Sequence, residues 1–481
     1  MPDFTRLALD REEMRALGYR VVDMIADHWA DLADKPVAQT PAPGGVSQAL
    51  AAPPPDGPGS LDSVLEELQR DVFSHIAHVN HPRFFAFVPS PANFVGVMGE
   101  ALAAGYNVFN GTWLAASGAA QIELRVVDWL RRICGFPEGA GGLFVSGGSM
   151  ANIVALAVAR HGRLDGPNGK ARVYFSAQTH SSIERGLRLL GFADEQSVRL
   201  PVDDNFRLDV RALAERIRAD RATGLVPFCV VANAGTTNTG AIDPLPELAR
   251  LCRKEGLWLH ADGAFGAAAA VSERGRQALA GLDQVDSLSI DPHKWLFQPF
   301  EIGCVLVRER RWLRDAFHVL PDYMQDTRAE EETINLGEYG PQLTRSFRAL
   351  KLWMTLRIFG RDALAAAIEH GFELAEQAEQ KLEDKKNWEI VSPAQMAMVA
   401  FRYAPPDVSP EEADALNAEI VRRLSADGYA MLSSTRLNGR TALRLCTINP
   451  RTTEDDIAGT IDRLDELARN MHSVQDPGLS R

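Results

Sequence analysis

The feature that most constrains the fold of this chain is an alternation of short β-rich runs with helical stretches that begins near Gly141. The runs with this character are Arg172–Ser176, Val226–Ala232, Leu257–Ala261, Ser287–Ile290 and Gly303–Val307. Such an alternation predicts an α/β fold built around a mainly parallel sheet. Because ligands of such sheets bind beyond the carboxyl ends of the strands, the residues directly after these runs are candidates for a functional site.

The segment before this region reads as two helices joined by a stretch rich in proline and glycine. Asp10 and Glu13 form a capping-box pattern at the start of the first helix, and 61–78 has the apolar spacing of the second. Both helices have apolar faces and little chain of their own to cover them. We therefore expect them to dock on another body, such as a partner subunit.

The region after Arg345 reads as a long amphipathic helix, which Gly360 and Gly371 are expected to punctuate. From Trp388 the pattern changes to that of a smaller α/β unit. Its expected strands and helices are 390–392, 396–403, 442–448, 410–427 and 453–470. The sequence thus predicts a small C-terminal α/β domain.

Composition narrows the class of protein. The chain has 481 residues, 46% of them apolar, and a net charge of −13. This size permits a large core and more than one domain, and the acidic balance argues against nucleic acid or an anionic membrane as the main partner. The five cysteines are scattered without a C-x-x-C pair, which favours reduced thiols over disulfides or a metal site. We expect a cytoplasmic protein.

Lys294 is the first residue with a chemical signature. A lysine after a strand is usually solvated and inert. This one follows the apolar run 287–290 and precedes the apolar residues 295–297, so its stem is expected to be partly buried. Burial favours the neutral, nucleophilic amine, which forms Schiff bases with aldehydes.

A site for an aldehyde cofactor that carries a phosphate needs four further features, of which one is a hydroxyl that Thr236 or Thr237 offers after a strand. Gly147, Gly148 and Ser149 precede an apolar helix, where backbone N–H groups and the helix dipole favour an anion. Asp262 closes an apolar strand and could pair with a protonated ring nitrogen. His180 opens a helix after a strand and could cover a flat ring. Ordinary turns and helix caps are the alternative interpretation of each.

The chain also resembles a known family, the group II pyridoxal 5′-phosphate (PLP) decarboxylases of fold type I, and is most similar to its aromatic-L-amino-acid branch. The resemblance covers almost the whole chain. It rests on several motifs in the family's order, namely His81-Pro-Arg-Phe-Phe-Ala-Phe, Ser146-Gly-Gly-Ser-Met-Ala-Asn, Thr179-His-Ser-Ser-Ile-Glu-Arg, Ala234-Gly-Thr-Thr, Trp258-Leu-His-Ala-Asp, Asp291-Pro-His-Lys-Trp and Arg345-Ser-Phe-Arg-Ala-Leu-Lys.

The resemblance implies a role for each matching residue. Lys294 is the Schiff-base lysine and His293 a neighbour of the phosphate. Gly148 and Ser149 hold the phosphate, and His180 stacks on the ring. The remaining cofactor residues are Thr237 beside cofactor and substrate, Asp262 at the pyridine nitrogen, and Ala264 on the other ring face. The implied substrate-pocket residues are Phe87, Pro89, Ser90, Phe109 and Trp113.

The resemblance also implies an aspartate-aminotransferase-like fold with a seven-stranded, mainly parallel sheet and helices on both faces. Expected domains are an N-terminal helical dimerisation segment (1–85), a large PLP-binding domain (86–365) and a small C-terminal α/β domain (366–481). The family forms homodimers with the active site at the subunit interface, and Phe109 and Trp113 are contributed across it.

The expected reaction is decarboxylation of an aromatic L-amino acid to an amine and CO2. The aromatic branch protonates the product carbon with a loop tyrosine, expected here within 322–342. Counting back from Arg345 puts Leu336 at that position, and Tyr339, which lies three residues later, is our candidate donor. In this family, phenylalanine in place of that tyrosine accompanies oxidative deamination to an aldehyde, so an aldehyde synthase is the alternative outcome. An acidic substrate is a further alternative if Arg83 points inward. A separate alternative is a binding protein that kept the fold and lost turnover.

Overall fold

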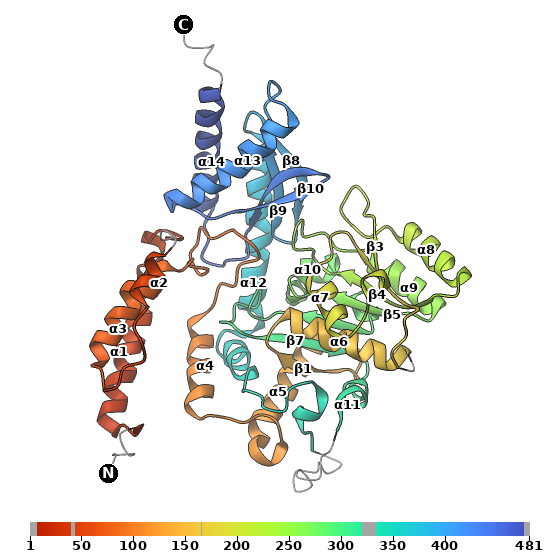
Figure 1. The fold of residues 1–481 in the computed structure, drawn as a ribbon, viewed down its shortest axis with the longest axis horizontal. Coiled ribbons are helices and arrows are strands. Elements are labelled where there is room, and N and C mark those ends of the chain that lie inside the picture. The colour runs from red at the N-terminus through yellow and green to blue at the C-terminus, as the bar shows by residue number, and fades with distance from the viewer. Residues whose placement is uncertain (1–6, 40–43, 165, 320–332, 476–481) are drawn as a thin grey trace.

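The structure is a computed structural model that describes residues 7–39, 44–164, 166–319 and 333–475 (Figure 1). Its centre is a seven-stranded sheet in the order β1-β7-β6-β5-β4-β2-β3. The strands are β1 (Gly141–Val145), β2 (Ala171–Ser176), β3 (Ser197–Leu200), β4 (Val226–Asn233), β5 (Trp258–Asp262), β6 (Ser287–Ile290) and β7 (Gly303–Val307). Strands β2 to β6 pair in parallel, and β7 runs antiparallel to both of its neighbours. The predicted α/β fold is confirmed.

Helices cover both faces of this sheet because each strand sends alternate residues into two apolar cores. Tyr174 and Val230 lie in one core, and Phe175 and Val231 lie in the other. The first core includes side chains of α5 (Trp113–Ile133), α8 (Val210–Ala222), α9 (Leu245–Glu255) and α12 (Ala349–Glu383), and the second those of α6 (Gly148–Arg163), α7 (Ser182–Leu189) and α11 (Arg311–Phe317).

The N-terminal helices project from this body (Figure 1). Helix α1 (Arg11–Ala30) starts with the predicted capping box, in which Asp10 accepts from the backbone of Glu13 and the Glu13 carboxylate accepts from the backbone of Asp10. The second helix was predicted as one element over 61–78. It is instead α3 (Leu61–Glu67), a π-helical turn (Leu68–Val72) and a 3-10 turn (Phe73–His75), so its regular part is shorter than predicted.

Helix α12 connects the large sheet to the C-terminal region. It is kinked at Gly360, whose φ of 78° is a conformation that glycine adopts without strain. Gly371 does not punctuate it: this residue is buried inside the helix, where a side chain would meet Trp295 and the carbonyl of Thr447. The expected domain boundary at 365/366 falls within α12.

The C-terminal region forms a separate antiparallel sheet in the order β10-β11-β9-β8, and its core includes side chains of the end of α12 and of two further helices. The elements are β8 (Trp388–Gln395), β9 (Met398–Tyr403), α13 (Pro410–Asp427), β10 (Ser433–Leu437), β11 (Arg440–Cys446) and α14 (Glu454–Gln475). The half-polar edge strand β10 was not predicted. The small α/β unit is otherwise as expected.

Shorter elements complete the fold. They are α2 (Gly45–Ala49), α4 (Phe94–Gly105), α10 (Glu273–Ala278) and 3-10 turns at Leu32–Asp34, Asp194–Gln196, Gly266–Val271, Leu282–Gln284 and Leu336–Tyr339. Among the described helices, none has both the length and the apolar character that crossing a bilayer requires.

Candidate active site

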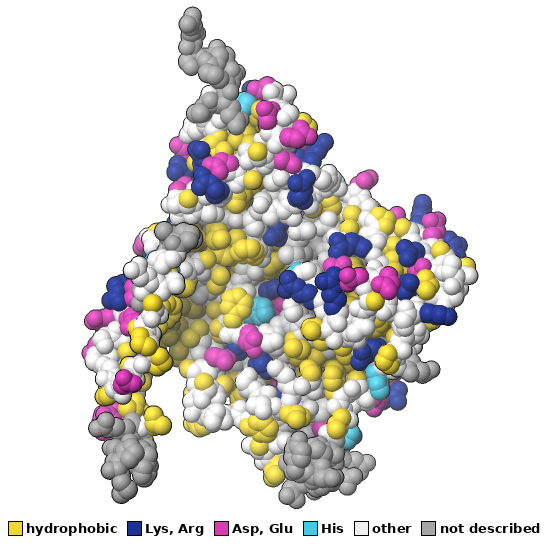
Figure 2. Space-filling view, in the orientation of Figure 1, with side chains coloured by type: hydrophobic (Ala, Val, Ile, Leu, Met, Phe, Trp, Pro, Cys, Tyr) yellow, Lys and Arg dark blue, Asp and Glu magenta, His cyan; other side chains and the backbone are white. Residues whose placement is uncertain are grey.

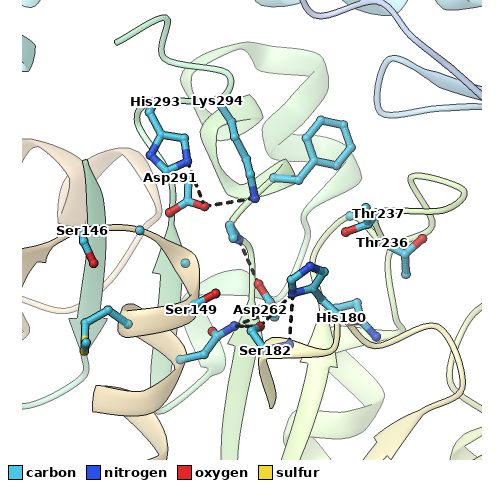
Figure 3. A pocket seen from close by; sticks show the side chains of 18 of the residues that line it. Ser146, Ser149, His180, Ser182, Thr236, Thr237, Asp262, Asp291, His293 and Lys294 are labelled. Carbon is cyan, nitrogen blue, oxygen red and sulfur yellow. Dashed lines mark hydrogen bonds and ion pairs between the residues drawn. The ribbon is translucent and has the colours of Figure 1, made fainter. Parts of the chain in front are cut away.

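A cavity of about 280 Å³ opens at the carboxyl edge of the large sheet. Its walls come from the turn after β1 and from the residues that follow β2, β4, β5 and β6. Figure 3 shows Lys294 and Asp262 pointing into it from opposite sides. The predicted cofactor residues that line this cavity are Gly148, Ser149, His180, Thr237, Asp262, Ala264, His293 and Lys294. The structure therefore brings together residues that lie far apart in the sequence.

Lys294 lies four residues after the end of β6, and its side chain is largely buried. Its Nζ is 3.0 Å from Oδ2 of Asp291, and that carboxylate also lies 3.5 Å from Nε2 of His293. The backbone N–H of Ile302 donates to Nδ1 of His293 at 3.3 Å, which leaves the proton of a neutral imidazole on Nε2. Burial lowers the pKa of His293, so we expect the neutral form near pH 7.

The turn between β1 and α6 forms a cradle at a helix N-terminus. A Cβ on Gly148 would lie 2.7 Å from Cβ of Ala264 and 2.8 Å from Oδ2 of Asp291, so only glycine fits there. Gly147, Gly148 and Ser149 line the cavity at the start of α6, where the first N–H groups of a helix have no intrahelical partner. This arrangement suits a phosphate group.

Neighbouring donors fix the position of the Asp262 carboxyl group. Oδ2 accepts from the side-chain nitrogen of Asn152 at 2.9 Å, and Oδ1 accepts from Ser289 at 3.1 Å and from the backbone N–H of Ala264 at 3.2 Å. An acid fixed in this way can hold a protonated ring nitrogen.

Asn152 is a site residue that sequence reasoning missed. Its side-chain nitrogen also donates to Oγ of Ser182 at 3.0 Å, and its oxygen lies 2.9 Å from Nε2 of His260. Burial lowers the pKa of His260, which keeps that imidazole neutral. The position of Asn152 at the end of the glycine-rich motif was the available signal.

His180 makes contacts typical of a helix cap and also lines the cavity, the two roles that its sequence position suggested. Its Nδ1 lies 2.9 Å from Oγ of Ser182 and accepts from the backbone N–H of that residue at 3.2 Å, as a cap at the start of α7 would. The ring also lines the cavity. Burial lowers the pKa of His180 and Asp262 opposes that shift.

The residues expected in the substrate pocket do not line the cavity within one chain. Phe87 and Phe109 are 58% and 40% exposed. Trp113 packs against the second core, and its backbone N–H donates to Asn335 at 2.9 Å. Pro89 and Ser90 also lie off the cavity wall described for residues 7–39, 44–164, 166–319 and 333–475.

The candidate proton donor, Tyr339, also lies away from the cavity wall. Tyr339 packs against the second core and does not line the cavity, and Leu336 is buried beside it. Burial raises the pKa of Tyr339, so its hydroxyl stays protonated. Of the expected loop, 322–342, residues 322–332 lie outside the described residues.

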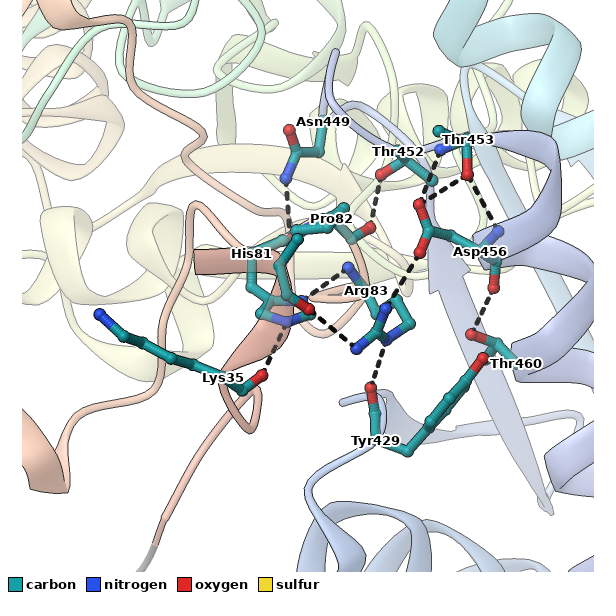
Figure 4. A network of polar contacts seen from close by, with 11 residues as sticks. Lys35, His81, Pro82, Arg83, Tyr429, Asn449, Thr452, Thr453, Asp456 and Thr460 are labelled. Carbon is teal, nitrogen blue, oxygen red and sulfur yellow. Dashed lines mark hydrogen bonds and ion pairs between the residues drawn. The ribbon is translucent and has the colours of Figure 1, made fainter. Parts of the chain in front are cut away.

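Arg83 does not point into the cavity. Figure 4 shows its guanidinium in a network between the N-terminal segment and the C-terminal region. Nε donates to the carbonyl of Tyr429 at 2.8 Å, and Nη1 lies 3.2 Å from Oδ1 of Asp456. The cation that an acidic substrate would need is therefore not supplied by Arg83, because its charge is already paired.

Two more residues at the cavity were not predicted. Glu301 lies on the wall and pairs with Arg348 at 3.0 Å. Arg444, from β11, donates to the carbonyl of Thr237 and to Oγ of Ser433, and so ties the C-terminal sheet to the cavity. Neither stands next to a recognisable motif, so only the fold identifies them.

Comparison with known proteins supports the same assignment. Residues 43–404 match the pyridoxal-dependent decarboxylase conserved domain. The chain is 47% identical to an aromatic-L-amino-acid decarboxylase of Bacillus atrophaeus over 97% of both chains, and 32% identical to a phenylacetaldehyde synthase of Arabidopsis thaliana over 93% of this chain and 94% of that one. The crystal structure of Oryza sativa TDC with PLP and tryptamine superposes with a TM-score of 0.92, at 29% identity, over 96% of this chain and 99% of that one.

An amine, a fixed carboxylate and an anion cradle that share one cavity on this fold define a PLP-dependent enzyme of fold type I. The donor set fits the cofactor: glycine leaves room at the cradle, and the lysine and the acid face each other across the cavity. The chain belongs to the pyridoxal-dependent decarboxylase family. It is thus a carboxy-lyase whose cofactor is PLP.

Proposed function

We propose that this enzyme removes the carboxylate of an aromatic L-amino acid and releases the amine and CO2. The observation that carries the proposal is the shared cavity of Lys294 and Asp262 in a chain 47% identical to an aromatic-L-amino-acid decarboxylase over nearly its full length. The pairing of Arg83 with Asp456 favours an aromatic over an acidic substrate, because it leaves that guanidinium no role at the cavity.

PLP, when bound, supplies a conjugated ring that accepts the electrons of the bond to the departing carboxylate. The residues of this chain prepare that chemistry. Lys294 presents the amine that bonds to the cofactor aldehyde, and Asp262 keeps the ring nitrogen protonated. Gly148 and Ser149 hold the phosphate with His293 nearby. His180 and Ala264 bound the ring faces, and Thr237 lies beside cofactor and substrate. Their common effect is to orient the reacting groups before reaction.

A homodimer would complete the substrate pocket. No residue of α1, all of which is described, is buried in the single chain. Figure 2 shows hydrophobic side chains gathered between the N-terminal helices and the body of the molecule. Exposed apolar patches of this kind mark interfaces. A second copy would cover them and would bring Phe109 and Trp113 to a neighbouring cavity, where they would face the substrate ring with Phe87, Pro89 and Ser90. Mass measurement in solution tests this assembly.

The three expected domains and a cytoplasmic location are part of the same proposal. Under it, 1–85 serves dimerisation, 86–365 binds PLP and 366–481 forms the small domain. The network of Figure 4 supports a close attachment of the first segment to the last. The five cysteines are all free and buried, as suits a reducing compartment. Limited proteolysis and cell fractionation test these two points.

An aldehyde synthase is the second candidate. It is favoured by the 32% identity to a phenylacetaldehyde synthase and by the absence of Tyr339 from the cavity wall in the described residues. That reaction consumes O2 and water and yields aldehyde, CO2, ammonia and hydrogen peroxide. Product analysis separates it from simple decarboxylation.

The deciding experiment incubates the holoenzyme with a panel of aromatic, acidic and aliphatic L-amino acids and identifies the products. We expect amine and CO2 from aromatic substrates. Lys294→Ala should abolish both turnover and the visible absorption band of the bound cofactor. Lys170→Ala, at an exposed lysine, is the matched control and should change neither. Retention of both properties in Lys294→Ala would refute the assignment.

A further inference from the structure

Asp291 is a buried acid at the cofactor cavity to which neither the motifs nor the reaction assigns a role. It follows β6 directly and is only 2% exposed. Oδ2 contacts Nζ of Lys294 at 3.0 Å. Oδ1 has no hydrogen-bond partner among the described residues. A buried carboxylate oxygen without a partner is costly and calls for an explanation.

This carboxylate lies against the turn that forms the anion cradle. A Cβ on Gly148 would lie 2.8 Å from Oδ2, and a Cβ on Gly303 would lie 2.9 Å from Oδ1 and 2.5 Å from Cα of Gly147. Figure 3 shows Asp291, His293 and Lys294 on the same side of the cavity. A phosphate held by the N-terminus of α6 would thus lie beside a second anion.

Two anions at one buried site cannot both stay fully ionised without a cation or a shared proton. The cation that contacts Asp291 is Lys294, whose amine is the group that bonds to the cofactor aldehyde. The other titratable groups that face Asp291 are His293, His180 and Cys304. Burial raises the pKa of the Cys304 thiol and lowers those of both histidines, so none of these three brings a charge.

His293 is placed to share a proton with Asp291. Its Nδ1 is occupied by the backbone N–H of Ile302, and its Nε2 lies 3.5 Å from Oδ2. With the Nε2–H of His293 facing Oδ2, a proton taken up by the carboxyl on Oδ1 would let that oxygen donate to a phosphate in the cradle and so give it the partner it lacks among the described residues. Lys351 adds a positive field that opposes charging of the imidazole itself.

We propose that Asp291 couples cofactor binding to protonation: the phosphate of PLP enters the cradle together with one proton, which the Asp291 carboxyl shares with the phosphate. The proposal rests on the proposed phosphate cradle but not on the substrate. Because binding takes up a proton, the contribution of Asp291 should lower the affinity for PLP about tenfold for each pH unit above neutrality.

The test is a thermodynamic cycle that removes one charge from the protein and, separately, the phosphate from the ligand. Dissociation constants of PLP and of pyridoxal, which lacks the phosphate, are measured for the apoenzyme and for Asp291→Asn between pH 7 and 9. The change to asparagine keeps the shape and removes the charge. Pyridoxal controls for effects on Lys294, since both ligands carry the aldehyde.

We expect the ratio of the wild-type to the Asp291→Asn dissociation constant to rise about tenfold per pH unit for PLP and to stay flat for pyridoxal. A PLP ratio that rises no more steeply than the pyridoxal ratio would overturn the proposal. If Asp291→Asn does not fold, calorimetry of the wild type in buffers of different ionisation enthalpy decides. Binding of PLP should then take up about one proton more than binding of pyridoxal, and equal uptake would refute the coupling. Turnover is not measured, so failure here leaves the proposed reaction untouched.

Discussion

The side-chain nitrogen of Asn152 donates a 2.9 Å hydrogen bond to Oδ2 of Asp262 at the base of the cofactor cavity. The oxygen of the same amide faces His260, so a flip of the Asn152 side-chain amide would lose the hydrogen bonds on both sides. The amide therefore sets the direction of the carboxyl group that we assign to the ring nitrogen. Helix α6 supplies both this amide and the cradle at its N-terminus, which couples the two ends of the cofactor site.

Asn152→Ala should weaken PLP binding and slow turnover. A hydrogen bond to a charged group contributes roughly 1.5–3 kcal/mol, so we expect affinity for PLP to fall about tenfold or more. Titration of the apoenzyme with PLP measures the effect. Asn205→Ala, at an exposed loop position, is the control. Unchanged affinity in Asn152→Ala would show that Asp262 is held adequately by Ser289 and the backbone alone.

Tyr339→Phe tests the proposed proton donor. If Tyr339 delivers the proton, from a neighbouring subunit or after movement of its segment, its loss should divert product from amine to aldehyde with ammonia and peroxide. Product analysis by chromatography, with a peroxide assay, measures the ratio. Tyr106→Phe, at a tyrosine that is 81% exposed, serves as the control. An unchanged amine yield in Tyr339→Phe would remove this residue from the reaction.

Glu123→Gln should destabilise the fold. Glu123 accepts from Arg345, from the Phe144 backbone at 3.0 Å and from Asn110 at 2.8 Å, and is fully buried. Glutamine would leave the Arg345 guanidinium buried without its counter-charge, which costs roughly 3–5 kcal/mol. Urea unfolding measures the loss. Glu309→Gln breaks an exposed pair with Arg311 and should cost at most about 1 kcal/mol. Similar losses in both variants would contradict this account.

Stability should fall at acidic pH in part through His81. Burial lowers the pKa of this imidazole to about 4 from an ordinary 6.5, and Nδ1 accepts from the backbone N–H of Arg83 at 2.9 Å while Nε2 lies 3.0 Å from the carbonyl of Lys35. Between these two values the unfolded chain binds more protons than the folded one. The contribution is therefore intact above pH 6.5 and is lost as pH falls toward 4.

The measurement compares the free energy of unfolding at pH 7 and pH 5 in the wild type and in His81→Asn. Asparagine retains an acceptor and does not titrate. We expect the wild type to lose about 1–2 kcal/mol more than the variant over this interval. Equal losses would show that His81 titrates normally in the folded protein.

Much of the fold followed from local patterns. The runs 287–290 and 303–307 were placed with their observed bounds, and the capping box at Asp10 formed as predicted. The gathering of the predicted cofactor residues in one cavity also followed, because parallel strands direct their carboxyl ends to one edge and so bring together the residues after each strand. The irregular turns after Glu67 were missed, since apolar spacing does not distinguish an α-helical turn from a π-helical one.

The sequence by itself determined the class of fold and the predicted cofactor residues of the cavity, because strand periodicity, capping and the chemistry of lysine, aspartate and glycine are properties of short segments. Only the tertiary structure decided where the longer side chains point. Arg83 turns to Asp456, Tyr339 packs against the second core, and Oδ1 of Asp291 has no hydrogen-bond partner among the described residues. The physical reason is that the direction of a side chain depends on partners hundreds of residues away, whose position exists only once the chain is folded.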